Sequence, residues 1–337
     1  MPNRSSMRDV ARAAGVSLQT VSRVANGEPG VVDDKRDRVL SAMRELEYRP
    51  NSAARAMRRG AFRTVGVVYH SLHSVGTHRS LEQISERAAA QGYGTTIMPL
   101  VAASGLAANG AFTRLVEMAV DVVIVVFPSP FGAGSLEIPT SLPAVVLGPP
   151  QGHGSSSVDF DQDSAARLVV EHLVDLGHPT VHHIAGPQES FAARARVETW
   201  RSILEVHGLR VPTLRYGDWS AESGYVAMRQ ILADEKATGS GAPTAIYAGN
   251  DQMALGVYRA LAEAGLRVPE DVSVVGCDDV DEAAAYAPPL TTVAQDWAAL
   301  GEQTMRTALA MAGGAAPSDT VLPMRIVIRD STAPYRG

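Results

Sequence analysis

Short apolar runs alternate with amphipathic segments from residue 64 onward, and this alternation limits the possible folds more than any other feature of the chain. Thr64–Tyr69 and residues 122–127 are rich in β-branched residues and too short to form helices. Residues 80–91 lie between these runs, have an amphipathic helical pattern and end at Gly92. Because strands that are apolar throughout must be buried on both faces, the pattern predicts parallel sheets covered by helices on both sides.

The same alternation occurs a second time after residue 162, with strands expected at residues 182–185 and 245–248. Two doubly wound units in series predict an α/β fold of two lobes separated by a cleft. In such sheets, ligands bind in the loops beyond the carboxyl ends of the strands. These loops are residues 70–72, 186–196, 249–251 and 277–279. A helix at residues 297–311 and a single strand at residues 321–329 are expected to close the chain.

The N-terminal region predicts a short helix with a polar outer face. Ser17 can cap this helix by accepting a hydrogen bond from a first-turn amide, and Val21 and Val24 fall on one side of it. The other side carries Leu18, Gln19, Ser22 and Arg23. Gln19 suits the edge of an adenine, Arg23 suits a guanine, and Ser and Thr hydroxyls reach phosphates. The side chains are typical of a DNA recognition helix, although a lone solvent-exposed helix has similar residue types.

Two further helices are expected to flank this segment. Residues 9–13 predict a helix that ends at Gly15, which gives the order helix, glycine-containing turn, helix of a helix-turn-helix unit. Residues 33–48 predict a third helix with acidic residues in its first turn. One stripe of this helix contains Val39, Met43 and Leu46. Three short helices provide a minimal core, so we expect an N-terminal all-α DNA-binding head.

The charge distribution agrees with a DNA-binding head. The formal net charge of the chain is -6, which taken alone argues against nucleic acid as a partner. Residues 1–63, however, contain thirteen Lys or Arg and seven Asp or Glu, a formal charge of +6, so the remainder carries -12. A basic head on an acidic body is expected when only the head contacts phosphates.

Composition excludes several other classes. With 45% hydrophobic residues, the chain can bury a large core. It has no apolar run long enough to span a membrane and no apolar export segment after its polar N-terminus, so a cytoplasmic protein without a membrane partner is expected. The one cysteine, Cys277, rules out an internal disulfide or a cysteine-based metal cluster. The sequence predicts neither a cofactor nor a metal site.

The N-terminal motifs resemble the head of the lactose-repressor family of bacterial transcription regulators. The matching segments are Asp9-Val10-Ala11, Ala14-Gly15-Val16-Ser17, Thr20-Val21-Ser22-Arg23-Val24 and Tyr48-Arg49-Pro50-Asn51. The resemblance implies a hinge helix at residues 51–57, which inserts an apolar side chain, here Met57, into the minor groove of operator DNA. The positions at which it implies DNA contact are Ser17, Leu18, Gln19, Thr20, Ser22, Arg23, Asn26, Asn51, Ala54 and Met57.

The rest of the chain resembles the sugar-responsive core of the same family, which is itself similar to periplasmic binding proteins. The matching segments include residues 217–221, 250–256, 273–276 and 288–292. The resemblance implies effector contacts from His70, Phe160, Arg196, Trp219, Asn250, Asp278, Gln295 and Trp297. Three positions depart from the family pattern, since His70 replaces a serine, Gly148 an aspartate and Trp297 a phenylalanine. These changes imply a related but different glycoside.

The resemblance also implies a domain organisation. A head is expected at residues 1–50, a hinge helix and linker at 51–63, and an effector-binding and dimerisation core at 64–337. Within the core, one lobe is expected to comprise residues 64–161 and 294–320, and the other residues 162–291 and 321–332. Because the chain ends soon after its last expected strand, we expect a homodimer and no tetramer-forming helix.

We expect a repressor of a sugar-utilisation operon that is released from double-stranded operator DNA by a galactoside or similar small glycoside. One alternative is a co-repressor-dependent regulator with a non-sugar effector. Another is a sugar-binding transport protein, which the basic head and the absent export segment disfavour. An enzyme is not expected, since the adjacent acids Asp278 and Asp279 should point in opposite directions after a strand and cannot flank one glycosidic bond. The sequence also lacks the common hydrolase, metalloprotease and nucleotide-binding motifs.

Overall fold

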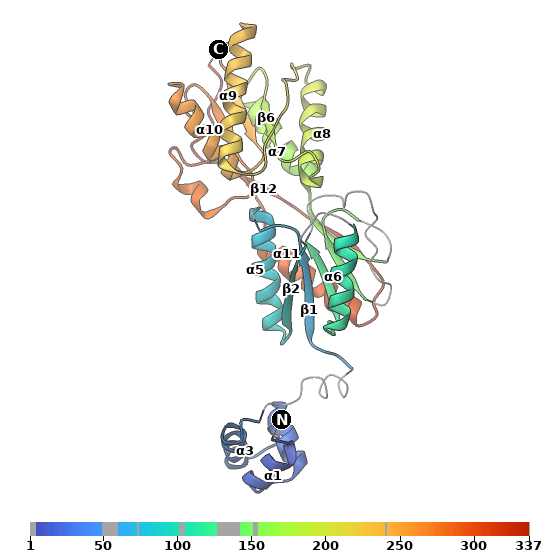
Figure 1. Cartoon of the computed structure of the whole chain (residues 1–337). Helices are drawn as coiled ribbons and strands as arrows, with labels where there is room; N and C mark the ends of the chain where they lie inside the picture. The colour runs from blue at the N-terminus through green and yellow to red at the C-terminus, as the bar shows by residue number, and fades with distance from the viewer. Residues whose placement is uncertain are drawn as a thin grey trace. The chain divides into compact units, whose positions relative to one another are not determined.

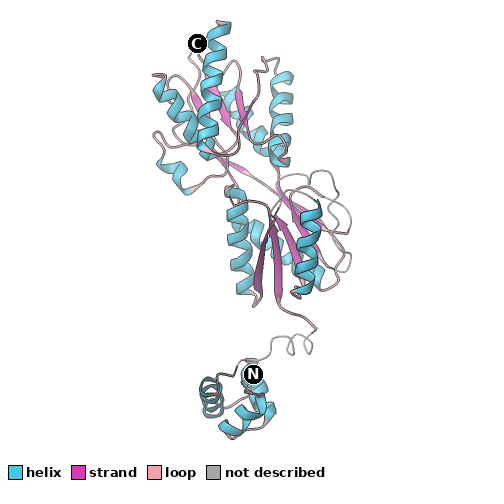
Figure 2. Cartoon of the chain, viewed as in Figure 1, coloured by secondary structure: helices cyan, strands magenta, loops and turns pink. Residues whose placement is uncertain are grey.

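The computed structural model describes residues 5–48, 60–72, 74–100, 105–126, 142–150, 154–239 and 241–336. The chain forms two compact units, Met1–Phe62 and Arg63–Gly337. The first unit is all-helical, and the second contains all the described strands (Figures 1 and 2). Together they confirm the predicted fold class, an all-α head and a core with two parallel-sheet lobes.

The head consists of three helices: α1 (Met7–Ala14), α2 (Leu18–Ala25) and α3 (Asp33–Glu45). Their apolar sides form one small core that includes Val10, Val21, Val24 and Val39. The turn between α1 and α2 is tied to α3, because the Arg38 guanidinium donates hydrogen bonds to the carbonyls of Ala14 and Gly15. These contacts satisfy carbonyls at the end of α1 that lack a partner within the helix.

The first lobe of the core is built on a six-stranded parallel sheet in the order β11-β5-β4-β3-β1-β2. The strands are β1 (Thr64–Tyr69), β2 (Gly94–Pro99), β3 (Val122–Val126), β4 (Ala144–Leu147), β5 (Ser156–Phe160) and β11 (Asp319–Leu322). The helices are α5 (Val75–Ala90), α6 (Gly105–Glu117) and α11 (Trp297–Ala312). Successive residues of β1 point to opposite faces of this sheet. Val67 packs with apolar residues of α5 and α11 on one face, and Val68 packs against α6 on the other.

The second lobe is built on a four-stranded parallel sheet in the order β7-β6-β8-β9. The strands are β6 (His182–Ala185), β7 (Arg215–Tyr216), β8 (Ala245–Ala248) and β9 (Ser273–Val275). The helices are α7 (Gln162–Asp175), α8 (Phe191–Val206), α9 (Ala221–Thr238) and α10 (Asp251–Glu263), followed by a 3-10 turn, η1 (Asp281–Ala285). On β8, Tyr247 packs with α7 and α8, whereas Ile246 packs with α9 and α10. Helices therefore cover both faces, as predicted.

The prediction of one strand at residues 321–329 is wrong. The structure has two short strands there: β11 pairs in parallel with β5, and β12 (Arg325–Val327) pairs antiparallel with β10 (Thr292–Ala294). Pro323 lies between them, and it has no N–H with which to continue a ladder. The break lets the chain leave the six-stranded sheet and form a separate two-stranded sheet, β10-β12, between the lobes (Figure 1).

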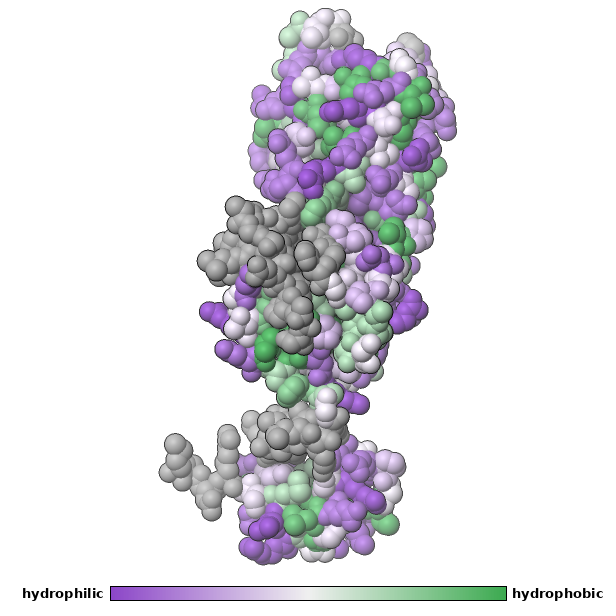
Figure 3. All heavy atoms as spheres, turned by 90° about the vertical axis from the view of Figure 1, so that its right-hand side faces the viewer, coloured by the Kyte–Doolittle hydropathy of each residue, from purple (hydrophilic) through white to green (hydrophobic). Residues whose placement is uncertain are grey.

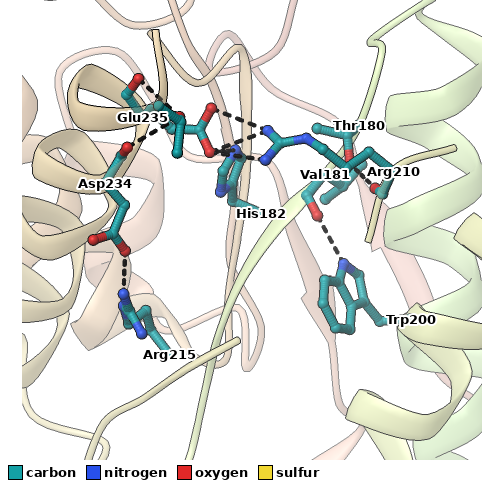
Figure 4. A network of polar contacts seen from close by, with 9 residues as sticks. Thr180, Val181, His182, Trp200, Arg210, Arg215, Asp234 and Glu235 are labelled. Atoms are coloured by element: carbon teal, nitrogen blue, oxygen red, sulfur yellow. Dashed lines mark hydrogen bonds and ion pairs between the residues drawn. The ribbon is translucent and has the colours of Figure 1, made fainter. Parts of the chain in front are cut away.

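A charged network around the buried Glu235 supports the edge of the second sheet (Figure 4). Glu235 of α9 is buried and accepts hydrogen bonds of 3.0–3.1 Å from the Arg210 guanidinium. The imidazole of His182, on β6, lies 3.7 Å from the same carboxylate. Burial lowers the pKa of His182 to about 4 although Glu235 favours its charged form, so the imidazole is neutral near pH 7. Nearby, Arg215 pairs with Asp234.

Hydrophilic and hydrophobic residues are interspersed over the face shown in Figure 3. Within the described ranges, no helix is both long and apolar enough to cross a membrane.

Candidate functional site

A cavity of about 150 Å³ lies between the two lobes of the core. Its walls come from segments at the carboxyl ends of β3, β4, β5, β8 and β9 and from the first turns of α5, α8 and α11. This is where parallel sheets of this kind place their ligands. Seven of the eight predicted effector residues line this cavity, namely Phe160, Arg196, Trp219, Asn250, Asp278, Gln295 and Trp297.

Arg196 is the most constrained polar residue of the cavity. It lies on the inner face of α8 and is 3% exposed. Its Nε donates to the Gln162 side-chain oxygen at 2.9 Å, and its Nη1 donates to the carbonyl of Gly249 at 2.6 Å. Because these contacts come from α7 and from the loop after β8, the guanidinium is fixed in orientation before any ligand binds. A fixed guanidinium can donate paired hydrogen bonds to adjacent oxygens.

Asp278 is held in an uncommon backbone conformation, with a φ of 115°. Its carboxylate accepts a hydrogen bond from the Gln295 amide at 2.6 Å. Burial raises the pKa of Asp278 to about 7, while Arg196 acts to lower it. Asp279 instead pairs with Arg329 at 2.6 Å, so the two adjacent carboxylates have different partners. Strained non-glycine backbone of this kind is concentrated at functional sites.

Asn250 has a structural role in addition to its place on the cavity wall. Its side-chain oxygen accepts from the Met253 amide at 2.9 Å and caps α10. Its side-chain nitrogen donates to the Trp219 carbonyl at 3.1 Å and to the Gln252 side chain at 2.9 Å. Both N–H groups of the Asn250 amide already have partners, whereas its oxygen has accepted one hydrogen bond and can accept another. We therefore expect Asn250 to accept a hydrogen bond from a ligand.

Aromatic rings form the apolar walls. Phe160 and Trp297 meet edge to face with their centroids 5.2 Å apart. Trp219 has a φ of 73°, and its ring lies so close to Gly186 that a Cβ there would be 2.1 Å away. Glycine is therefore needed at residue 186 for this ring to reach the cavity. Such rings offer flat apolar surfaces suited to the apolar face of a sugar.

His70 is the predicted effector residue that does not line this cavity; it follows β1 and is half-buried. Gly148 does line it, with a φ of 137° and no side chain. Asp159, Gln162 and Ser190 also line the cavity, although they were not among the predicted effector contacts. Ligands bind beyond the carboxyl ends of the strands in such sheets, and Asp159 and Gln162 lie at that end of β5. A carboxylate at this position is the sequence signal that could have predicted them.

Helix α2, the predicted recognition helix, has the expected capping and exposure. The Ser17 hydroxyl accepts from the Thr20 amide at 3.1 Å, which confirms the predicted cap of α2. Ser17, Leu18, Gln19 and Arg23 are exposed, and Thr20, Ser22 and Asn26 are half-buried. The three hinge positions, Asn51, Ala54 and Met57, lie outside the described residues.

The two sites define the class of protein. A helix-turn-helix head with an exposed polar helix is joined to a binding-protein-like core with a mostly apolar, polar-anchored cavity. Within the described part of the chain, no group of three or more His, Cys, Asp or Glu side chains is arranged to hold a metal ion. The class is that of a DNA-binding regulator with a ligand-responsive core.

Comparison with known proteins gives the family. The model for bacterial regulatory proteins of the lacI family matches residues 6–51, and the model for periplasmic binding protein-like domains matches residues 170–332. The chain is 37% identical over 328 residues to the lactose operon repressor of Escherichia coli (strain K12), covering 96% of this chain and 89% of the relative. It is 32% identical over 310 residues to the repressor PurR of Haemophilus influenzae, covering 90% of each.

A solved structure extends the similarity to the fold. The lac repressor dimer bound to operator and the anti-inducer ONPF has a TM-score of 0.86 and 35% identity to this chain, covering 98% of this chain and 100% of that one. The chain belongs to the lacI family of bacterial regulatory proteins. It is a DNA-binding repressor with an effector-binding core, and not an enzyme.

Proposed function

We propose that this protein represses a sugar-utilisation operon, and that a galactoside or similar small glycoside releases it from its operator. The observation that carries this proposal is the composition of the cavity. A fixed guanidinium, side-chain amides and carboxyl groups lie together with aromatic rings, and these groups come from both lobes. Polar side chains of this kind match ring hydroxyls, and the aromatic rings match the apolar face of a sugar.

The proposed mechanism depends on the origin of the contacts. Arg196 and Asn250 belong to the second lobe, whereas Phe160 and Trp297 belong to the first. A bound sugar that contacts both sets favours one relative orientation of the lobes. A ligand shifts such an equilibrium only by its differential affinity for the two states, typically about 1–3 kcal/mol per coupled site.

On DNA, we propose that two heads of a homodimer bind the halves of a near-palindromic operator. In each head, Gln19 and Arg23 of α2 are assigned to base edges, and Ser17, Thr20 and Ser22 to phosphates. Leu18 and Asn26 complete this contact surface. The hinge positions Asn51, Ala54 and Met57 are assigned to the minor groove.

A titration of the protein–operator complex tests this function. Fluorescence anisotropy of labelled operator DNA is followed while galactosides, other small glycosides, nucleobases and amino acids are added in turn. We expect at least one glycoside to release the DNA in a saturable manner. Release or tightening by a nucleobase or an amino acid, with no response to any sugar, would replace the sugar by another class of effector.

A further inference from the structure

Asp159 is a half-buried carboxylate on the wall of the effector cavity, and none of the contacts described above uses it. It is the penultimate residue of β5. One of its oxygens accepts from the Phe160 amide at 2.8 Å, and the Gln162 side chain lies beside it. A hydrogen bond from the Gln162 side chain also acts to lower the pKa of Asp159. Because the two oxygens of a carboxylate together accept several hydrogen bonds, Asp159 can still accept one from a ligand that donates.

Carboxyl groups outnumber cationic side chains among the described residues of the cavity wall. Among the described residues that line it, Arg196 is the only cation, whereas Asp159 and Asp278 are both carboxylates. The Arg196 Nε and Nη1 atoms already donate to Gln162 and Gly249. Burial raises the pKa of Asp159 to about 6, even though hydrogen bonds and Arg196 act to lower it. Among the described lining residues, two carboxyl groups therefore share Arg196 as their cation.

Helix N-termini at the cavity do not remove this excess. The partial positive charge of a helix N-terminus favours anions, and the first turns of α5, α8, α10 and α11 lie at the cavity. In each of these helices, however, a cap side chain already accepts from a first-turn amide. One of these caps, Asp296, is itself a carboxylate, as is Asp161, which caps the neighbouring α7.

We propose that Asp159 is a specificity-determining residue of the effector cavity, and that it selects sugars bearing a positively charged amine over the same sugars bearing a hydroxyl. This inference rests on the proposed sugar effector. An ammonium group beside Asp159 forms a charge-assisted hydrogen bond, which is stronger than one from a neutral hydroxyl. By the same reasoning, a sugar acid at this position is repelled by the carboxylate.

Calorimetric titration of the full chain tests this selection. The probes are matched pairs of a monosaccharide and its amino sugar, such as galactose with galactosamine and glucose with glucosamine, together with the corresponding uronic acids. We expect one amino sugar to bind at least tenfold more tightly than its parent and the uronic acid to bind more weakly than both. Asp159→Asn should remove most of the amine preference and still bind the parent sugar.

Asp161→Asn is the matched control. It makes the same charge change two residues away, in a side chain that does not line the cavity, and asparagine is an equally good helix cap. It should leave the amine preference unchanged. If the parent and amino sugars bound equally well, or if the Asp159→Asn protein kept the full preference for the amino sugar, the role of Asp159 would be overturned. The proposed sugar effector would still stand. Binding of no sugar by the unaltered protein would overturn the sugar effector, and this inference with it.

Discussion

The head and the effector cavity present their polar residues in opposite ways. In the head, Gln19 and Arg23 project from an eight-residue helix into solvent, and two valines anchor that helix in a small core. In the cavity, Arg196 and Asp278 are buried and bonded to neighbours from other elements. Substitutions on the outer face of α2 should therefore change recognition and leave stability nearly intact, whereas substitutions in the cavity should change both.

The largest effect is expected from Arg196→Met, which keeps most of the side-chain volume and removes the guanidinium. The carbonyl of Gly249 and the side chain of Gln162 lose a donor, and the buried Asp278 loses its neighbouring positive charge. Removing one partner of a buried charged contact typically lowers the free energy of unfolding by about 3–5 kcal/mol. Urea unfolding of the full chain measures the loss. The control is Arg201→Met on the exposed side of α8, and equal stabilities of the two variants would contradict the comparison.

Acid should affect the core through its buried histidines, and His182 is one of them. Its pKa is lowered to about 4 by burial, so the unfolded chain binds a proton before the folded chain does. The contribution of neutral His182 to the free energy of unfolding is complete above about pH 6.5 and is lost as the pH falls from 6.5 towards 4. At pH 5 the loss is about 2 kcal/mol. His182→Gln removes this contribution, so its unfolding free energy should fall less between pH 7 and pH 5. An unchanged pH dependence would show that His182 is not the group responsible.

Arg23→Ala tests the exposed side of the comparison. It should cost about 1–3 kcal/mol of operator affinity and relax preference at one base pair. The free energy of unfolding should change by no more than about 0.5 kcal/mol, because the side chain is exposed. Binding to a set of single-base operator variants measures the preference. As the control, Arg12→Ala should weaken all variants alike and flatten the salt dependence; full discrimination by Arg23→Ala would show that α2 does not read that base.

The smallest effect is expected from Ser17→Ala, which removes the hydroxyl that caps α2. Loss of such a cap typically costs about 1 kcal/mol. Hydrogen exchange of the α2 amides in the full chain should become about fivefold faster. Ser41→Ala, within α3, is the control and should leave α2 unaffected. Unchanged exchange in α2 would mean that its stability comes from the packing of Val21 and Val24 alone.

The sequence predicted those features that depend on local pattern. The alternation of apolar strands and amphipathic helices gave both parallel sheets, and the Ser17 cap was recognised from residue type. The split of residues 319–327 into β11 and β12 was missed, because Pro323 was not read as a break between two sheets. Asp159 was missed although it lies near the carboxyl end of β5, where the strand-end rule applies. Its place on the cavity wall beside Arg196 depends on how the two lobes pack, which no local pattern predicts.

Reciprocity between the two ligands tests the central claim most directly. The affinity of the releasing glycoside is measured by calorimetry for the free protein and for the protein saturated with operator DNA. If one equilibrium connects cavity and head, operator DNA must weaken the sugar by the same factor by which the sugar weakens operator binding, about 5–150-fold. Equal sugar affinities with and without operator DNA would contradict the account.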